Sequence, residues 1–144
     1  MTVPDSSFLF SFYGLDGHSA QAVAMARSLD EPLTLTALHR FEFENAQRLA
    51  VFRGLVMRED ANRRLAALDA DIAAGSVVLA PHEPASLVEA ARKLSARFTE
   101  TLGQRAMDIL LVAAAVELGA TAFLTFDARQ QKLAKAVGLR VEIN

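Results

Sequence analysis

Short apolar runs alternate with longer stretches of helical periodicity along the whole chain. Five runs have the length and composition of strands: Met1–Pro4, Pro32–Thr36, Ser76–Leu79, Thr121–Thr125 and Arg140–Ile143. The stretches between them predict helices at about 19–29, 37–53, 58–74, 85–102, 105–118 and 128–136. Gly119 and Gly138 lie where helix C-caps are expected. Strands that alternate with helices of this length predict an α/β fold, with a parallel sheet covered by helices on both faces.

Two acidic residues follow predicted strands directly. Asp5 comes after Pro4, and Asp127 comes two residues after Thr125. Functional groups of parallel sheets gather beyond the carboxyl ends of the strands, so both acids are candidates for a site there. Because proline cannot donate a ladder hydrogen bond, Pro4 is expected at a strand end or edge, and the first strand must be very short.

Helix-face spacing separates Glu42 from Glu44. Glu44 has Arg40 and Arg48 four residues away on either side, which predicts an ion-paired, solvated face. Glu42 instead has Leu38 and Ala46 at those positions. A carboxylate on an apolar stripe loses hydration at a cost of several kcal/mol unless a partner compensates. Glu42 is therefore a candidate metal ligand, with a buried salt bridge as the more common alternative.

Asp108 and Asp127 each have a structural explanation as well as a functional one. Asp108 occupies the first turn of a helix that is apolar on every side, where the helix dipole alone favours an acid. Asp127 precedes Ala128-Arg-Gln-Gln-Lys132 and could be the N-cap of the last helix. Either role is about as common as a functional one.

Convergence of the four acids would change this balance. Carboxylates at ~5 Å repel one another by roughly 3 kcal/mol per pair at an effective dielectric near 20. A fold tolerates such a cluster only if protons or cations neutralise it. Oxygen ligands without cysteine or clustered histidine select hard cations such as Mg²⁺ or Mn²⁺.

Composition narrows the class of protein. The 144 residues fit one domain, residues 1–144, and the formal net charge of −2 argues against a dedicated non-specific nucleic-acid binder. There are no cysteines, and the three histidines are too dispersed for a compact zinc motif. The longest apolar run, Ile109–Val116, is far too short to span a bilayer, and the N-terminus lacks the basic region of a secretory signal. We therefore expect a soluble protein of the reducing cytoplasm.

Four segments in order carry a family resemblance. They are Asp5-Ser-Ser-Phe-Leu9, Leu35–Ala46, Arg105–Ala115 and Leu124–Gln130. In order and spacing they resemble the PIN domain, specifically the VapC-like toxin ribonucleases of type II toxin–antitoxin systems. The resemblance covers essentially the whole chain. It implies a three-layer α/β/α sandwich, a Mg²⁺- or Mn²⁺-dependent endoribonuclease, an RNA substrate, a cognate antitoxin partner and a homodimer.

The resemblance also implies roles for individual residues. The catalytic, metal-binding acids fall on Asp5, Glu42, Asp108 and Asp127. Residues that orient the ligands or a water fall on Ser7, Asn45 and Thr125. Arginines near these segments could anchor phosphate, namely Arg40, Arg105 and Arg129, although solvated helix surfaces explain any one of them. The sequence departs from the pattern at Pro4, at Leu111, where many relatives carry histidine, and at Gln131, where some place a further acid.

Five phenylalanines are candidates for a partner groove or dimer face, with core packing as the more common alternative: Phe8, Phe10, Phe12, Phe41 and Phe52.

Two other functions compete with the nuclease. A non-catalytic PIN-fold module that binds RNA or protein would lack a metal. An aspartate-based phosphohydrolase would need a second aspartate close to Asp5 and a lysine after a late strand. The next aspartate is Asp16, and no lysine directly follows Phe126.

Overall fold

Five short strands form one parallel sheet in a computed structural model that describes residues 1–141. The spatial order is β3-β2-β1-β4-β5, and all neighbouring pairs run parallel. The strands are β1 (Thr2–Pro4), β2 (Leu33–Leu35), β3 (Val77–Leu79), β4 (Ala122–Leu124) and β5 (Arg140–Val141). Each lies within its predicted run, and residues 142–143 of the fifth run lie outside the described part of the chain.

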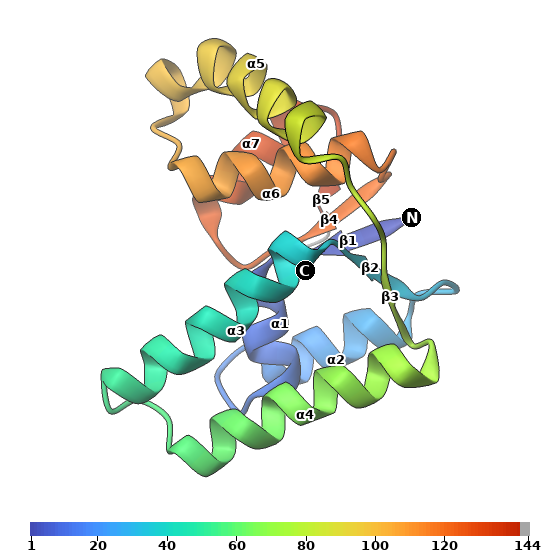
Figure 1. Cartoon of the computed structure of the whole chain (residues 1–144), viewed down its shortest axis with the longest axis vertical. Helices are drawn as coiled ribbons and strands as arrows, with labels where there is room; N and C mark the ends of the chain where they lie inside the picture. Colours follow the sequence, from blue (N-terminus) through green and yellow to red (C-terminus); the bar gives the residue numbers. More distant parts are fainter. Residues whose placement is uncertain (142–144) are drawn as a thin grey trace.

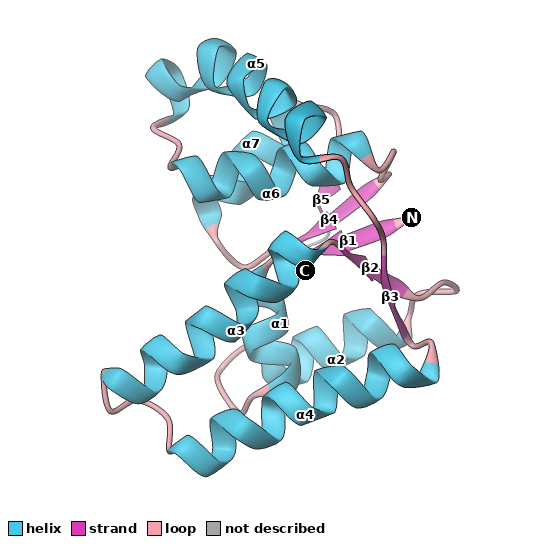
Figure 2. Ribbon diagram, in the orientation of Figure 1, coloured by secondary structure: helices cyan, strands magenta, loops and turns pink. Residues whose placement is uncertain are grey.

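Seven helices cover the sheet: α1 (Ser6–Tyr13), α2 (Ser19–Arg27), α3 (Ala37–Phe52), α4 (Arg58–Ala74), α5 (Pro84–Leu102), α6 (Ala106–Glu117) and α7 (Ala128–Ala136). Figure 1 shows α5, α6 and α7 on one side of the sheet and α1 to α4 on the other. The secondary-structure colouring in Figure 2 makes the same three layers visible. The predicted three-layer α/β/α sandwich is therefore confirmed.

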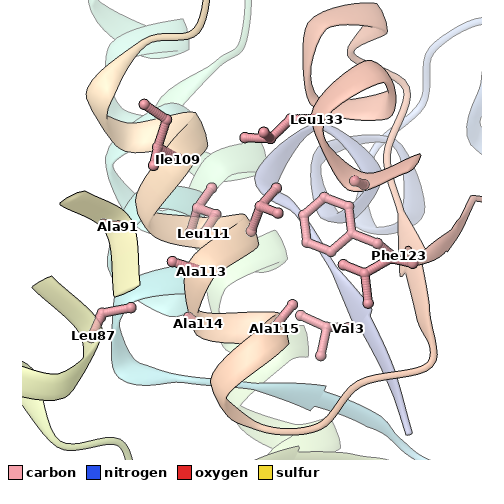
Figure 3. Close-up of a cluster of buried hydrophobic side chains, with 13 residues drawn as sticks. Val3, Leu87, Ala91, Ile109, Leu111, Ala113, Ala114, Ala115, Phe123 and Leu133 are labelled. Carbon is pink, nitrogen blue, oxygen red and sulfur yellow. The ribbon is translucent and has the colours of Figure 1, made fainter. Parts of the chain in front are cut away.

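Each face of the sheet has its own hydrophobic core. Val3 and Phe123 pack with Leu111 and other residues of the α5–α7 layer, as the close-up in Figure 3 shows. Leu35 and Leu124 pack instead with Phe8, Phe43 and their neighbours in the α1–α4 layer. Phe123 and Leu124 thus point to opposite faces, as the two-residue period of a strand requires. Strands buried on both faces read as continuous apolar runs, which is the pattern seen in the sequence.

The predicted ends of α6 and α7 are confirmed by their glycines. Gly119 and Gly138 follow these helices with φ angles of 71° and 90°. This left-handed conformation ends a helix at little cost only where the residue has no Cβ.

Helix α1 was not predicted. Its sequence, Ser-Ser-Phe-Leu-Phe-Ser-Phe-Tyr, has a mostly apolar composition that hides the helical period. The sequence nevertheless contains a signal for the start of this helix. Asp5 is the N-cap, and its Oδ1 accepts a 2.8 Å hydrogen bond from the Phe8 N–H.

Pro4 is the last residue of β1, the central strand. The next residue resumes the ladder, because the Asp5 N–H donates to the Leu124 carbonyl of β4 at 2.9 Å. Successive residues of a strand point their N–H groups to alternate sides, so the missing donor of Pro4 falls on the side of β2. There the pairing of β1 is recorded only at Thr2 and Leu33. A short strand therefore accommodates the proline, as expected.

Within residues 1–141, no helix combines the length and apolar character needed to cross a membrane.

Candidate functional site

The four predicted acids come from four different elements near the carboxyl edge of the sheet. Asp5 follows β1, and Asp127 follows β4. Glu42 lies in α3, and Asp108 lies in the first turn of α6. Electrostatic coupling links all four. Burial is the main cause of the raised pKa values of Asp5, Glu42 and Asp108. The charge of Glu42 adds to the rise at Asp5, the charges of Asp108 and Asp127 add to the rise at Glu42, and the charge of Asp127 adds to the rise at Asp108. The fold thus brings together residues separated by up to 122 positions.

Asp5 is fully buried and held on both oxygens. Its Oδ1 accepts from the Ser7 hydroxyl at 2.7 Å and from the Phe8 N–H at 2.8 Å. Its Oδ2 accepts from the Thr125 hydroxyl at 2.5 Å. Burial raises the pKa of Asp5 to about 7, and these three hydrogen bonds limit the rise. The orientation of the carboxyl is therefore fixed, while its charge depends on neutralisation by a proton or a cation.

Ser7 and Thr125 connect Asp5 to the segment that carries Asp127. The Ser7 hydroxyl accepts a 2.9 Å hydrogen bond from the Phe126 N–H, and the Thr125 hydroxyl accepts one of the same length from the Asp127 N–H. The two hydroxyls lie 3.3 Å apart. Ser7 and Thr125, two of the three residues expected to orient the ligands, therefore contact Asp5 directly, and Thr125 also fixes the backbone of Asp127.

The contrast between Glu42 and Glu44 is as the helix-face argument expects. Glu44 binds Arg40 at 2.9 Å and Arg48 at 3.4 Å. Glu42 is partly buried, and its pKa is raised by burial and by the charges of Asp108 and Asp127, against a hydrogen bond from Ser6. Its Oε2 is buried and has no hydrogen-bond partner among the described residues. The buried salt bridge that was the alternative for Glu42 is not among the ion pairs of the described residues.

Asp108, like Glu42, has a buried carboxylate oxygen without a hydrogen-bond partner among the described residues. Its side chain is 9% exposed, and burial and the charge of Asp127 raise its pKa, while Arg129 and Arg105 lower it. Its Oδ2 is buried without a hydrogen-bond partner in residues 1–141. An unpartnered carboxylate oxygen in the interior costs free energy unless an ion or a solvent molecule satisfies it.

Asp127 combines both of its anticipated roles. Its Oδ1 caps α7 by accepting from the N–H groups of Arg129 at 2.7 Å and Gln130 at 3.2 Å. Within residues 1–141, the hydrogen bonds and the ion pair of its carboxylate all end on Oδ1. Capping therefore leaves Oδ2 available for another partner, and the N-cap explanation does not exclude a functional one.

The donor set suits a hard divalent cation. The candidate ligand atoms are carboxylate and hydroxyl oxygens, and two of the carboxylate oxygens are buried without a hydrogen-bond partner in residues 1–141. Across the described residues, however, no three ligand-type side chains stand close enough to form a ready-made ion cage. The residues fit Mg²⁺ or Mn²⁺ in chemistry, and the four acids form a charge-coupled site more open than a complete ligand shell.

The remaining candidates are Arg105 and Arg129, which lie near the acids, and Arg40 and Asn45, which have no hydrogen bond or ion pair with them among the described residues. Arg105 and Arg129 act electrostatically on Asp108, so positive charge adjoins the acids. Arg40 is held by Glu44 and by Asp69 at 2.8 Å, on the ion-paired face of α3. Asn45 is exposed, and none of the hydrogen bonds found in residues 1–141 joins it to the acids.

The two other departures from the family pattern have defined surroundings. Leu111 is fully buried in the core between α6 and the sheet. The Gln131 amide donates to the Thr125 carbonyl at 3.3 Å, so it supports the strand end that carries Thr125. An acid at position 131 could not donate this bond in its ionised form.

Sequence reasoning missed Ser6, whose hydroxyl supports Glu42. The signal for Ser6 was its position directly after Asp5, at the start of α1. It was missed because α1 itself was not predicted.

Of the five phenylalanines proposed for a partner surface, Phe8 is fully buried in the core. Phe10 and Phe12 are partly buried, whereas Phe41 and Phe52 are 56% and 87% exposed.

Comparison with known proteins identifies the family and the proteins that share this fold. The sequence model described as "PIN domain" matches residues 2–136. No curated protein matches the chain in sequence. Among solved structures, VapC20 of Mycobacterium tuberculosis, described as a sarcin-ricin loop cleaving toxin, is similar with a TM-score of 0.71 and 19% identity over 97% of each chain.

Two further structures share the fold. PAE2754 of Pyrobaculum aerophilum has a TM-score of 0.64 and 18% identity, covering 97% of this chain and 89% of its own. FitAcB of Neisseria gonorrhoeae has a TM-score of 0.64 and 17% identity, covering 99% of this chain and 97% of its own. At these identities the likeness concerns the fold.

Proposed function

Since the chain belongs to the PIN-domain family, we propose that it is a Mg²⁺- or Mn²⁺-dependent endoribonuclease whose metal site is formed by Asp5, Glu42, Asp108 and Asp127. The observation that carries the proposal is the coupling of these four acids at one sheet edge, with Glu42 Oε2 and Asp108 Oδ2 buried and unpartnered. Buried carboxylates without partners cost free energy, and a bound cation would offset that cost.

Each residue has a distinct task in the proposed hydrolysis. A bound divalent cation would lower the pKa of a water molecule and stabilise charge on the attacked phosphate. Asp5, Asp108 and Asp127 would hold the cation, with Glu42 beside them. Ser7 and Thr125 keep the Asp5 carboxyl in one orientation. Thr125 also fixes the backbone at Asp127.

Positive charge beside the acids would receive the substrate. Arg105 and Arg129 already act on Asp108 and are both exposed, so they can reach an incoming phosphate. We assign Arg40 a lesser part, because binding phosphate would require it to leave Glu44 and Asp69. In-line attack of water would leave a 5′-phosphate and a 3′-hydroxyl. Exposed single-stranded RNA is the expected substrate, since its backbone can enter such an open site.

The toxin role comes from the family resemblance and from likeness to VapC20. It implies that the chain works in the cytoplasm with a cognate antitoxin and forms a homodimer. An exposed apolar surface supports binding of a partner chain. It lies on α3 and the loop after it and includes Phe41, Leu49, Phe52, Leu55 and Met57. Light scattering of the Phe52→Ser variant tests the homodimer, and co-purification with a neighbouring small gene product tests the antitoxin.

A non-catalytic binding module is the competing function. It would not require unpartnered acids at the sheet edge. Cleavage of a single-stranded RNA with Mn²⁺ distinguishes the two, comparing wild type with Asp108→Asn and with Asp69→Asn as an exposed-acid control. We expect cleavage by wild type and the control, and at least about a 100-fold loss in Asp108→Asn. Binding of RNA without metal-dependent cleavage would favour the module.

A further inference from the structure

Four aromatic rings form a stacked series that runs from the core to the surface beside the acids. Phe12 stacks on Phe8 with ring centroids 6.1 Å apart, and Phe8 stacks on Phe126 at 5.8 Å. His18 stacks on Phe126 at 4.5 Å, with only 15° between the ring planes. Phe8 is fully buried and His18 is an exposed residue, so the series connects the core to the surface.

The position of His18 is fixed by its own loop. Oδ1 of Asp16 accepts from the His18 N–H at 2.8 Å, and Oδ2 of Asp16 accepts from the Ser11 hydroxyl of α1 at 2.9 Å. Ser19 adds a hydrogen bond to Oδ1 of Asp16 at 3.2 Å. Asp16 thereby ties the loop that carries His18 to α1, and it acts as a positioning residue for the imidazole.

The stacked rings adjoin Asp127, one of the four acids. Phe126 lies between Thr125, which binds Asp5, and Asp127, and its own N–H is held by Ser7. Phe126 and Asp127 are consecutive residues, so their Cα atoms are only ~3.8 Å apart. A pocket of about 420 Å³ is lined by His18 and Phe126 together with Ser6, Ser7 and Asp127. His18, Phe126 and one of the four acids, Asp127, therefore open into the same space.

We propose that His18, backed by Phe126, is a base-stacking platform that binds the unpaired nucleobase next to the cleaved phosphate. This inference rests on the proposed ribonuclease function. Every nucleobase has a π face, so a flat exposed ring tolerates many sequences but binds the larger purines more strongly. A flipped or single-stranded base is required, because a base inside a duplex has both faces covered by its stacked neighbours. His18 is thus a specificity-determining residue for single-stranded RNA with a purine beside the cut.

Binding of a fluorescent oligonucleotide tests the platform without catalysis. The probe is a short single-stranded RNA with 2-aminopurine at one position, titrated with protein in EDTA. Stacking quenches this base, so wild type is expected to quench it at one position of the strand. We expect His18→Ala to lose the quenching and to bind about 5- to 150-fold more weakly, the range that loss of one stacked base allows. His18→Phe keeps a flat ring and is expected to retain both.

The control is Leu15→Ala, in the same loop and 95% exposed, which is expected to bind as wild type does. Thermal unfolding of each variant shows that the fold is retained, and His18 makes no side-chain cap bond whose loss would threaten α2. Equal quenching and affinity in wild type and His18→Ala would overturn the platform.

A second experiment separates this inference from the proposed function. An abasic site is placed at each position of a cleaved RNA, and kcat/KM is measured for wild type and His18→Ala. One abasic position is expected to reduce wild-type cleavage while causing no further loss in His18→Ala. Additive losses at every position would overturn the platform with the nuclease intact. If wild type cleaves no RNA with Mn²⁺, the proposed function fails, and the quenching assay alone decides whether His18 binds a base.

Discussion

The Thr125 hydroxyl donates a 2.5 Å hydrogen bond to Oδ2 of Asp5, joining residues 120 positions apart. The same hydroxyl accepts the Asp127 N–H at 2.9 Å. One side chain thus fixes two of the four acids. We expect Thr125→Val, which keeps the shape, to lose ~1–3 kcal/mol of stability because it leaves buried polar groups unsatisfied. Thr125→Ser is expected to retain most of it.

Chemical denaturation of these two variants measures the effect. The matched control is Thr101→Val, an exposed threonine of α5 whose hydroxyl bonds only locally, to the Phe98 carbonyl. A loss in Thr125→Val no larger than in Thr101→Val would show that Thr125 does not hold the site.

Asp5 predicts how the stability of the metal-free protein depends on pH. Its folded-state pKa is raised from 3.8 to about 7, chiefly by burial. Between these values the folded state retains a proton that the unfolded chain releases, so the free energy of unfolding contributed by Asp5 falls as pH rises. Each pKa unit corresponds to about 1.4 kcal/mol, so ionisation of Asp5 lowers the free energy of unfolding by a few kcal/mol between about pH 4 and pH 7.

Comparison with Asp5→Asn isolates this effect, because other buried groups also titrate. His39 has the opposite effect on the pH dependence of stability. Burial lowers the pKa of His39 from 6.5 to about 4, so its contribution to the free energy of unfolding falls as pH drops below 6.5. In EDTA, thermal unfolding should show Asp5→Asn gaining stability relative to wild type from pH 5 to pH 8. A constant difference between the two proteins across this range would contradict the raised pKa.

Glu42 and Glu44 form a test pair on one helix. Glu42→Gln removes a partly buried charge coupled to Asp108 and Asp127, so we expect a loss of at least about 10-fold in metal-dependent cleavage. Stability should be unchanged or higher, because an uncompensated charge is removed. Glu44→Gln breaks surface ion pairs worth no more than ~1 kcal/mol together and should cleave normally. Equal cleavage by both variants would remove Glu42 from the site.

Much of this arrangement could be predicted because local rules agreed with the fold. The apolar runs marked all five strands, and strand ends selected Asp5 and Asp127. Helical spacing separated Glu42 from Glu44 because one face is packed and the other ion-paired. The positive φ of Gly119 and Gly138 follows from the same kind of local rule. These features depend on neighbours within about one helical turn.

What escaped prediction depends on tertiary packing. Helix α1 is short and mostly apolar, with Phe8 and Leu9 buried in the core, so its helical period was not recognised. The hydrogen bond from Thr125 to Asp5, the pairing of Arg40 with Asp69 and the stacking of His18 on Phe126 all join residues distant in sequence. No spacing rule reaches across such separations, and the family resemblance supplied the convergence of the acids.

Calorimetric titration with Mn²⁺ tests the central claim most directly, using wild type, Asp5→Asn, Asp127→Asn and the exposed-acid control Asp69→Asn. The account predicts that wild type and Asp69→Asn bind Mn²⁺ alike, and that each of the other two variants binds at least about 10-fold more weakly. Absence of Mn²⁺ binding by wild type, or undiminished binding by Asp127→Asn, would contradict a metal site formed by the four acids.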